Sequence, residues 1–199
     1  HYGNLDGTDA AEFRAADERQ LTQPGQAALY RDVPIAYVWD DHDYGPNDAG
    51  ADSPTRTAAR TAYRQMVPHY PLVRTGDSPI QQAFTIGRVR IVVTDNRSER
   101  TDASMLGAAQ ERWLIDELTT ASRTHALVVW GNPVPWIADA DPTADDWGGW
   151  ADERARISTA LAAAGVDNLV MLSGDAHMVA LDDGTHTDYS GSGGVGFPL

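Results

Sequence analysis

The stretch 107–130, GAAQERWLIDELTTASRTHALVVW, decides the fold class, because it sets an amphipathic helix directly before a buried strand. In its first part Trp113, Leu114 and Leu118 recur at helical spacing, with charged residues between them. In its last part the run 126–130 is short, apolar and rich in β-branched and aromatic residues, which favours a strand covered on both faces. This alternation is typical of an α/β layered protein.

The same pattern continues on both sides of that stretch. Three further apolar runs predict strands, at 35–39, 89–94 and 169–173. Helical patterns are predicted over 9–18, 25–31, 53–66 and 152–164, the last ending at Gly165. The Gly/Asp-rich tail, 179–194, reads either as a hairpin or as a loop. No linker divides the chain, so we expect one domain over residues 1–199.

The amino-acid composition of the chain argues against several classes of function. The 199 residues carry 15 basic and 29 acidic side chains, a formal charge of −14, which disfavours binding to nucleic acid or anionic lipid surfaces. Cysteine is absent, which excludes disulfides, thiolate metal sites and cysteine nucleophiles. No apolar run approaches the ~20 residues that span a bilayer, and no signal peptide is visible, so localisation stays open.

The segment 39–43, WDDHD, concentrates three carboxylates and an imidazole just after a predicted strand. Such a density of Asp repels itself unless a cation lies beside it, and a di- or trivalent metal ion is the simplest candidate. Beside metal-bound aspartate, His42 could donate a proton to a leaving oxygen. The alternative is a solvated acidic loop on an acidic protein.

A second cluster, LSGDAH at 172–177, follows the last predicted strand. If this segment is extended, Asp175 and His177 project to the same side, as two metal ligands would. The alternative is a turn with a capping Asp and a surface His.

Polar side chains also follow the two remaining strands. Arg97 could present its planar fork to a phosphate, or form a structural pair with an aspartate. Asn132 could contact a substrate oxygen or a metal, or belong to a plain turn. Because the carboxyl ends of strands converge in an α/β fold, four polar strand ends predict one shared site.

Taken together, these motifs resemble the alkaline phosphatase D (PhoD-like) family of the calcineurin-like metallophosphoesterases. The matching pieces, in the family's order, are HYGN at 1–4, WDDHD at 39–43, DNR at 95–97, LG at 106–107 with Gln110 and Trp113-Leu114, WGNP at 130–133 and LSGDAH at 172–177. The resemblance implies an α/β/β/α metallophosphoesterase sandwich, partial in this chain, with a binuclear metal site. The metals implied are Fe³⁺ and a divalent ion such as Ca²⁺, Zn²⁺ or Mn²⁺.

The resemblance also implies residue roles. The implied metal ligands are Tyr2, Asp41, Asn47, Asp175 and His177; His42 and Asp43 are catalytic, with Asp43 orienting His42; Arg97 and Asn132 bind the phosphate. The implied reaction is hydrolysis of a small phosphoester, mono- or diester, by metal-activated hydroxide with His42 as general acid.

The chain departs from the family pattern at its start. The Gly-Asp that should precede His1 and supply a bridging ligand is not in this sequence, and an earlier motif is also missing. We therefore expect a catalytic domain incomplete at both ends, from a family whose members are often exported. The competing hypotheses are an inactive metal-binding or structural remnant of the same fold, and a halophile-type domain whose acidity serves hydration.

Overall fold

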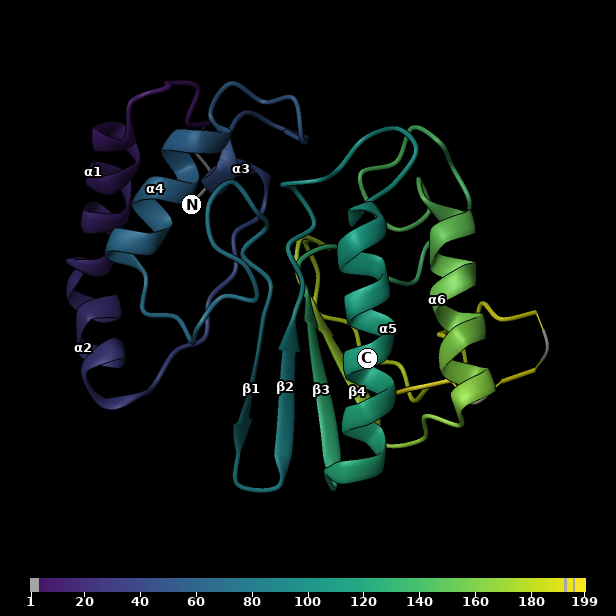
Figure 1. Ribbon diagram of the computed structural model, residues 1–199. Helices are drawn as coiled ribbons and strands as arrows, with labels where there is room; N and C mark the ends of the chain where they lie inside the picture. Colours follow the sequence, from purple (N-terminus) through teal and green to yellow (C-terminus); the bar gives the residue numbers. More distant parts are fainter. Residues whose placement is uncertain (1–3, 192, 195) are drawn as a thin grey trace.

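A computed structural model describes residues 4–191, 193–194 and 196–199, and its centre is one mixed sheet (Figure 1). The strands lie in the order β1 (Gln82–Ile86), β2 (Val89–Val93), β3 (Leu127–Asn132) and β4 (Leu169–Ser173). β1 is antiparallel to β2, whereas β2, β3 and β4 are parallel. The carboxyl ends of these three strands therefore share one edge of the sheet, where ligands bind in open α/β folds.

Two helices pack together beside the parallel strands, α5 (Gly107–Thr124) and α6 (Ala151–Ala164) (Figure 1). The buried residues of α5, at 110, 114, 118 and 121, form the stripe that a helix turns toward a core. Trp130 and Val128, on alternate positions of β3, are fully buried in the same hydrophobic cluster. α6 ends at Gly165, whose φ of 68° provides the left-handed cap that the sequence predicts.

Four helices form a second body beside the β1 edge of the sheet (Figure 1). They are α1 (Ala10–Leu21), α2 (Pro24–Asp32), α3 (Asp41–Tyr44) and α4 (Arg56–Met66). This body has its own hydrophobic cluster, which includes Phe13, Trp39 and Tyr63. The Trp39 indole donates to Asp95 Oδ1 at 2.8 Å, so the second body is tied to the segment that follows β2.

The α/β class is confirmed, and the strands predicted at 89–94, 126–130 and 169–173 are β2, β3 and β4. The predicted strand at 35–39 is wrong: these residues have no sheet partner among the described residues. Its aromatic side chains pack on α4 instead, with Tyr37 stacked on Tyr63 and the Tyr63 hydroxyl donating to the Tyr37 carbonyl. The described part of 179–194 is a loop rather than a hairpin.

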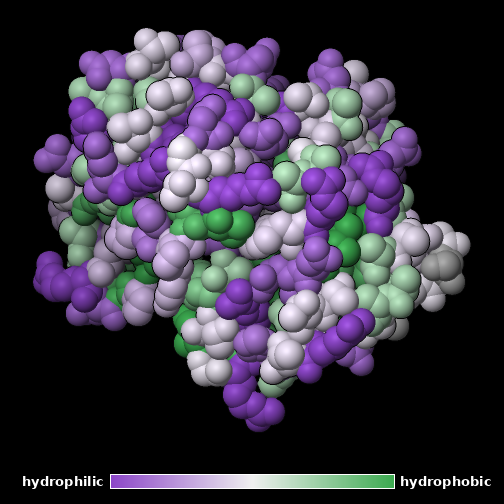
Figure 2. Space-filling view, viewed as in Figure 1, coloured by the Kyte–Doolittle hydropathy of each residue, from purple (hydrophilic) through white to green (hydrophobic). Residues whose placement is uncertain are grey.

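The resemblance implies two sheets, whereas the strands of the described residues form a single sheet. Within these residues, no helix combines the length and the apolar character needed to cross a bilayer. Hydrophilic residues cover most of the face seen in Figure 2, and hydrophobic residues show mainly in recesses between them.

Candidate active site

Three of the four predicted polar strand ends, those of β2, β3 and β4, meet at one edge of the sheet, whereas the fourth cluster, at 39–43, follows a segment that is not a strand. Asn96, just after β2, donates to Asn132 Oδ1 at the end of β3, at 2.9 Å. Asn132 in turn lies 3.4 Å from the Ser173 hydroxyl, at the end of β4. Arg97 donates from Nε to Asp40 Oδ1 at 2.6 Å, which brings in the start of α3. Segments far apart in the sequence thus form one connected polar region.

Three carboxylates form the centre of this region, and we call Asp41, Asp48 and Asp145 the acidic triad. One oxygen of each lies within 4.8 Å of the others. The backbone fixes Asp41, because the His42 amide donates to Oδ1 at 2.7 Å and the Asp48 amide donates to Oδ2 at 2.9 Å. Asp48 has a φ of 59°, and such backbone strain outside glycine is concentrated at functional sites.

The acidic triad fits a hard cation. Three carboxylate oxygens in one small volume are the donors that Ca²⁺ or Mn²⁺ prefers. Burial raises the pKa of Asp48, and the charge of Asp145 adds to the shift. A bound cation would offset the mutual repulsion of the ionised carboxylates by pairing with them.

Asp175 belongs to the same electrostatic neighbourhood. Burial raises its pKa, and the charges of Asp41 and Asp145 add to the shift. His177 Nε2 lies 3.6 Å from Asp175 Oδ1, and the His177 side chain is 70% exposed. The segment is not extended, which corrects the predicted geometry: Asp175 and His177 both have left-handed φ values, 58° and 51°. The turn after β4, not strand periodicity, therefore brings the two side chains together.

The Arg97 side chain is fully buried, and its guanidinium is hydrogen bonded to two carboxylates, those of Asp145 and Asp40. Nη1 and Nη2 donate to the two oxygens of Asp145, at 3.1 and 2.9 Å, while Nε bonds Asp40. Burial disfavours the charge, yet the hydrogen bonds to Asp145 and the charge of Asp40 raise the Arg97 pKa. This is the geometry of the structural ion pair that the sequence left open; phosphate binding by Arg97 stays a prediction.

Asp145 is held by two guanidinium groups, because Arg100 also pairs with it. Although burial alone would raise its pKa, the bonds to Arg97 and the Arg100 pair keep the pKa of Asp145 below its usual value. Asp40 shows the opposite balance: burial raises its pKa to about 6, and the charge of Arg97 offsets this only in part. The two guanidinium groups thus favour the ionised form of Asp145, whereas burial favours the protonated form of Asp40.

His42 follows Asp41 on α3, and its Nδ1 lies 2.7 Å from Asn4 Oδ1. An amide oxygen can only accept, so Nδ1 carries the hydrogen and the imidazole orientation is set by Asn4. Asp43 Oδ2 accepts from the Asp40 amide at 3.3 Å, and Asp43 also hydrogen bonds with the Tyr37 hydroxyl. The roles of His42 and Asp43 stay predictions.

The other predicted residues occupy different surroundings. Asn132 is buried, and its amide bonds the Val134 carbonyl, Asn96 and the Trp147 indole, which is a structural use of the side chain. Asn47 is exposed beside Asp48, and its ligand role stays a prediction. Tyr2 lies outside the described residues.

Sequence reasoning missed Asp48, Asp145, Asn4 and Arg100. The segments 40–56 and 138–150 are long and rich in aspartate, and long polar segments between regular elements often carry functional residues. Each loop holds several aspartates, however, and local sequence does not tell which one faces a neighbouring loop.

The fold and the site define the class of protein. It is an α/β protein with a carboxylate centre suited to cations, near the carboxyl ends of its parallel strands. The chain matches the model of the PhoD-like phosphatase family over residues 4–197, and it belongs to that family. Membership of this family supports the assignment of the chain as a metal-dependent phosphatase or hydrolase. No curated protein and no solved structure matched the chain.

Proposed function

We propose that this chain is a phosphoester hydrolase whose reaction centre is the acidic triad together with His42, Asp175 and His177. The observation that carries the proposal is the convergence of Asp41, Asp48 and Asp145 at the carboxyl edge of the sheet, in a chain of the PhoD-like phosphatase family. The substrate class is a small phosphoester.

The acidic triad would hold one cation, and Asp175 with His177 would contribute to a second, because Asp175 interacts electrostatically with Asp41. The bound cations would supply charge neutralisation for the phosphoryl oxygens and activation of a water molecule. We propose that the two cations are Fe³⁺ and a divalent ion, as the family resemblance implies.

His42 would serve as the general acid. Because Asn4 accepts from Nδ1, the second nitrogen of a protonated imidazole is the one that gives its proton to the departing alkoxide. Asp43, on the same short helix, would orient the His42 imidazole.

An open cleft of about 730 Å³ adjoins the acidic triad and would receive the substrate. Asp48, Arg100 and Trp150 are among the residues that line it, and the Arg100 guanidinium stacks 4.4 Å from the Trp150 ring centroid. Arg100 and Arg97 both pair with Asp145, so their first effect on the reaction would be to position that carboxylate. Direct phosphate contacts by Arg97 and Asn132 would require a rearrangement of their present hydrogen bonds.

The test uses the full chain with added Mn²⁺, Fe³⁺, Zn²⁺ or Ca²⁺, and p-nitrophenyl phosphate and its bis-ester as substrates. Asp41→Asn should lower the metal content per chain and abolish turnover, whereas Asp116→Asn, an equal charge change on the exposed side of α5, should change neither. His42→Ala should keep the metal and lose about 10²–10⁴-fold in rate. Metal binding without turnover would reject the enzyme proposal, and metal loss in His42→Ala would reject the role given to His42.

A further inference from the structure

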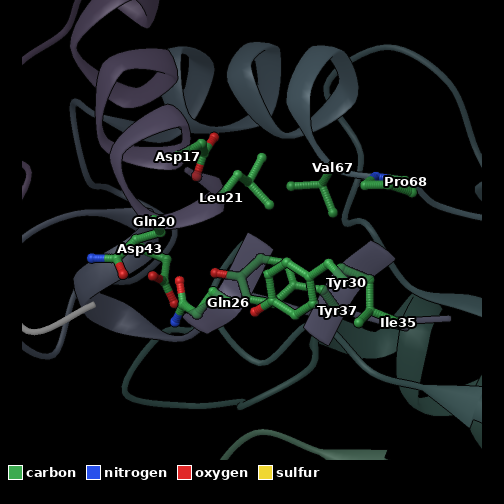
Figure 3. A pocket seen from close by; sticks show the side chains of 10 residues that line it. All are labelled: Asp17, Gln20, Leu21, Gln26, Tyr30, Ile35, Tyr37, Asp43, Val67 and Pro68. Atoms are coloured by element: carbon green, nitrogen blue, oxygen red, sulfur yellow. The ribbon is translucent and has the colours of Figure 1, made fainter. Parts of the chain in front are cut away.

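A small cavity lies at the N-terminus of α5, apart from the cleft beside the acidic triad. It has a volume of about 160 Å³, and it is lined by the first turn of α5, by residues of the loop 74–81 that precedes β1, and by Glu99. None of its described lining residues also lines that cleft. The larger cavity of the N-terminal helical body is a different feature, with the carboxylates of Asp17 and Asp43 in its lining (Figure 3).

The first turn of α5 supplies backbone donors to the small cavity. The Gly107 amide donates to Ser104 Oγ at 2.8 Å, whereas the N-cap residue, Leu106, offers no side-chain oxygen. The amides of Ala108 and Ala109, two residues of the lining, have no acceptor in the described part of the chain. Unpaired amides at the start of a long helix, together with the positive end of its dipole, favour an anion.

Gln81 gives a second, independent indication of a ligand. This residue is 3% exposed, and it belongs to the lining of the same cavity. Its Oε1 atom is buried with no hydrogen-bond partner, and no group of the described residues bonds its Nε2 atom either. A buried carboxamide costs free energy unless a ligand both accepts from its NH₂ group and donates to its oxygen.

The surroundings of the cavity have an excess of positive charge. Asp77 lines the cavity and pairs with Arg56 and Arg60. Glu99 also lines it, and its carboxylate lies 2.7 Å from Arg56 Nη2. Arg74 is exposed in the lining and makes no ion pair within the described residues. Three guanidinium groups therefore accompany two carboxylates, and a bound anion would complete the balance of charge.

We propose that this cavity binds inorganic phosphate. The amides of Ala108 and Ala109 and the Arg74 guanidinium would donate to its oxygens. Gln81 would donate through Nε2 and accept the phosphate O–H at Oε1, because inorganic phosphate keeps at least one P–OH group near neutral pH.

The size of the cavity favours the free ion over a phosphoester. Its volume of about 160 Å³ lies below the range of about 300–1,000 Å³ that is usual for sites of larger small molecules. The proposal goes beyond the phosphoester hydrolase activity and does not depend on it, because binding needs neither metal nor turnover.

The test is a heteronuclear NMR titration of the full chain, freed of metal on a chelating resin, with phosphate, sulfate and chloride at matched ionic strength. Removal of metal excludes phosphate binding through a cation at the acidic triad. We expect phosphate to shift the amide signals of Ala108 and Ala109 with 1:1 saturation. Its affinity should be about tenfold higher than that of sulfate, which has no proton to donate to Gln81 Oε1. No saturable shift with phosphate, an equal affinity for sulfate, or equal shifts with chloride would each overturn the proposal.

A matched pair of variants locates the binding. Arg74→Gln removes the unpaired charge of the cavity, whereas Arg88→Gln removes an equal charge from the exposed turn between β1 and β2, outside the cavity. We expect Arg74→Gln to weaken phosphate binding about tenfold and Arg88→Gln to leave it unchanged. Equal effects of the two variants would show a general charge effect and reject this cavity as the site.

A third variant, Gln81→Leu, tests the role of the buried carboxamide. It should bring the affinities for phosphate and sulfate to the same value, because a leucine cannot accept the phosphate O–H. A spectrum that otherwise matches that of the parent shows that the variant is folded. A preference for phosphate that survives in this variant would reject the role given to Gln81.

Discussion

Removal of the buried guanidinium of Arg97 should destabilise the fold strongly. The side chain is fully buried and holds Asp40 through Nε and Asp145 through two parallel bonds. Arg97→Met keeps much of the volume but leaves both carboxylates without this partner. Breaking a buried ion pair from one side typically costs about 3–5 kcal/mol. Asp40 and Asp145 are 22% and 24% exposed, so water relieves part of that cost.

We therefore expect the free energy of unfolding to fall by about 3 kcal/mol, at the lower end of that range. For a chain of this length, such a loss lowers the melting temperature by roughly 6–12 °C. Urea unfolding followed by circular dichroism measures the change, with a chelator in every sample so that metal loss does not contribute.

The control is Arg156→Met, because Arg156 also makes two bonds to one carboxylate, that of Glu111, but its side chain is 54% exposed. An exposed pair contributes about 0–1 kcal/mol, so this variant should unfold almost as the parent does. A loss below about 1 kcal/mol for Arg97→Met, equal to that of Arg156→Met, would refute the argument that Arg97 ties the site together.

Three further predictions concern single side chains. Burial and the charge of Asp43 raise the pKa of Asp17 to about 6 from 3.8, so the folded state holds this proton more tightly and stability falls as pH rises from about 4 to 6. Asp17→Asn should flatten that slope and raise stability at pH 7 in urea titrations; an unchanged slope would contradict this. Glu153→Gln should cost about 1–3 kcal/mol in urea unfolding, because the buried carboxylate accepts from the amides of Met105 and Leu106; a neutral result would contradict it. Gly174→Ala places a Cβ 2.9 Å from the Pro133 carbonyl oxygen and should cost about 1–3 kcal/mol in melting experiments; an unchanged melting temperature would contradict this.

The sheet was predictable because its strands carry local signals. β2, β3 and β4 are apolar runs of β-branched and aromatic residues, and α5 repeats its apolar positions at helical spacing. β1, QAFTI, has too few apolar residues in sequence to stand out, and it is held as the antiparallel partner of β2. The segment 35–39 has the composition of a strand, but its aromatic residues pack on α4. Tertiary packing overrides local propensity in both cases.

The sequence predicts which segments of the chain form the site, but not which side chains of those segments contact one another. The convergence of Arg97, Asn132 and Asp175 follows from the parallel strands β2, β3 and β4, whereas Asp41 lies on α3, after a segment that is not a strand. Asp145 and Asp48 come from loops whose paths depend on contacts far away in the sequence, such as the bonds from Arg97 to Asp145. Such contacts leave no periodic pattern in the chain.

The position of Arg97 explains why a carboxylate centre can exist in this acidic protein before any cation is considered. Its guanidinium joins Asp40, at the start of α3, to Asp145, in the loop between β3 and α6. Asp40 belongs to the N-terminal helical body and Asp145 to a loop that follows β3, so Arg97 links the two bodies, as the bond from Trp39 to Asp95 also does. The same bonds keep Asp145 ionised and aimed at Asp41 and Asp48. The arrangement of the acidic triad therefore depends on the docking of both bodies, because Asp41 and Asp48 come from one and Asp145 from the other.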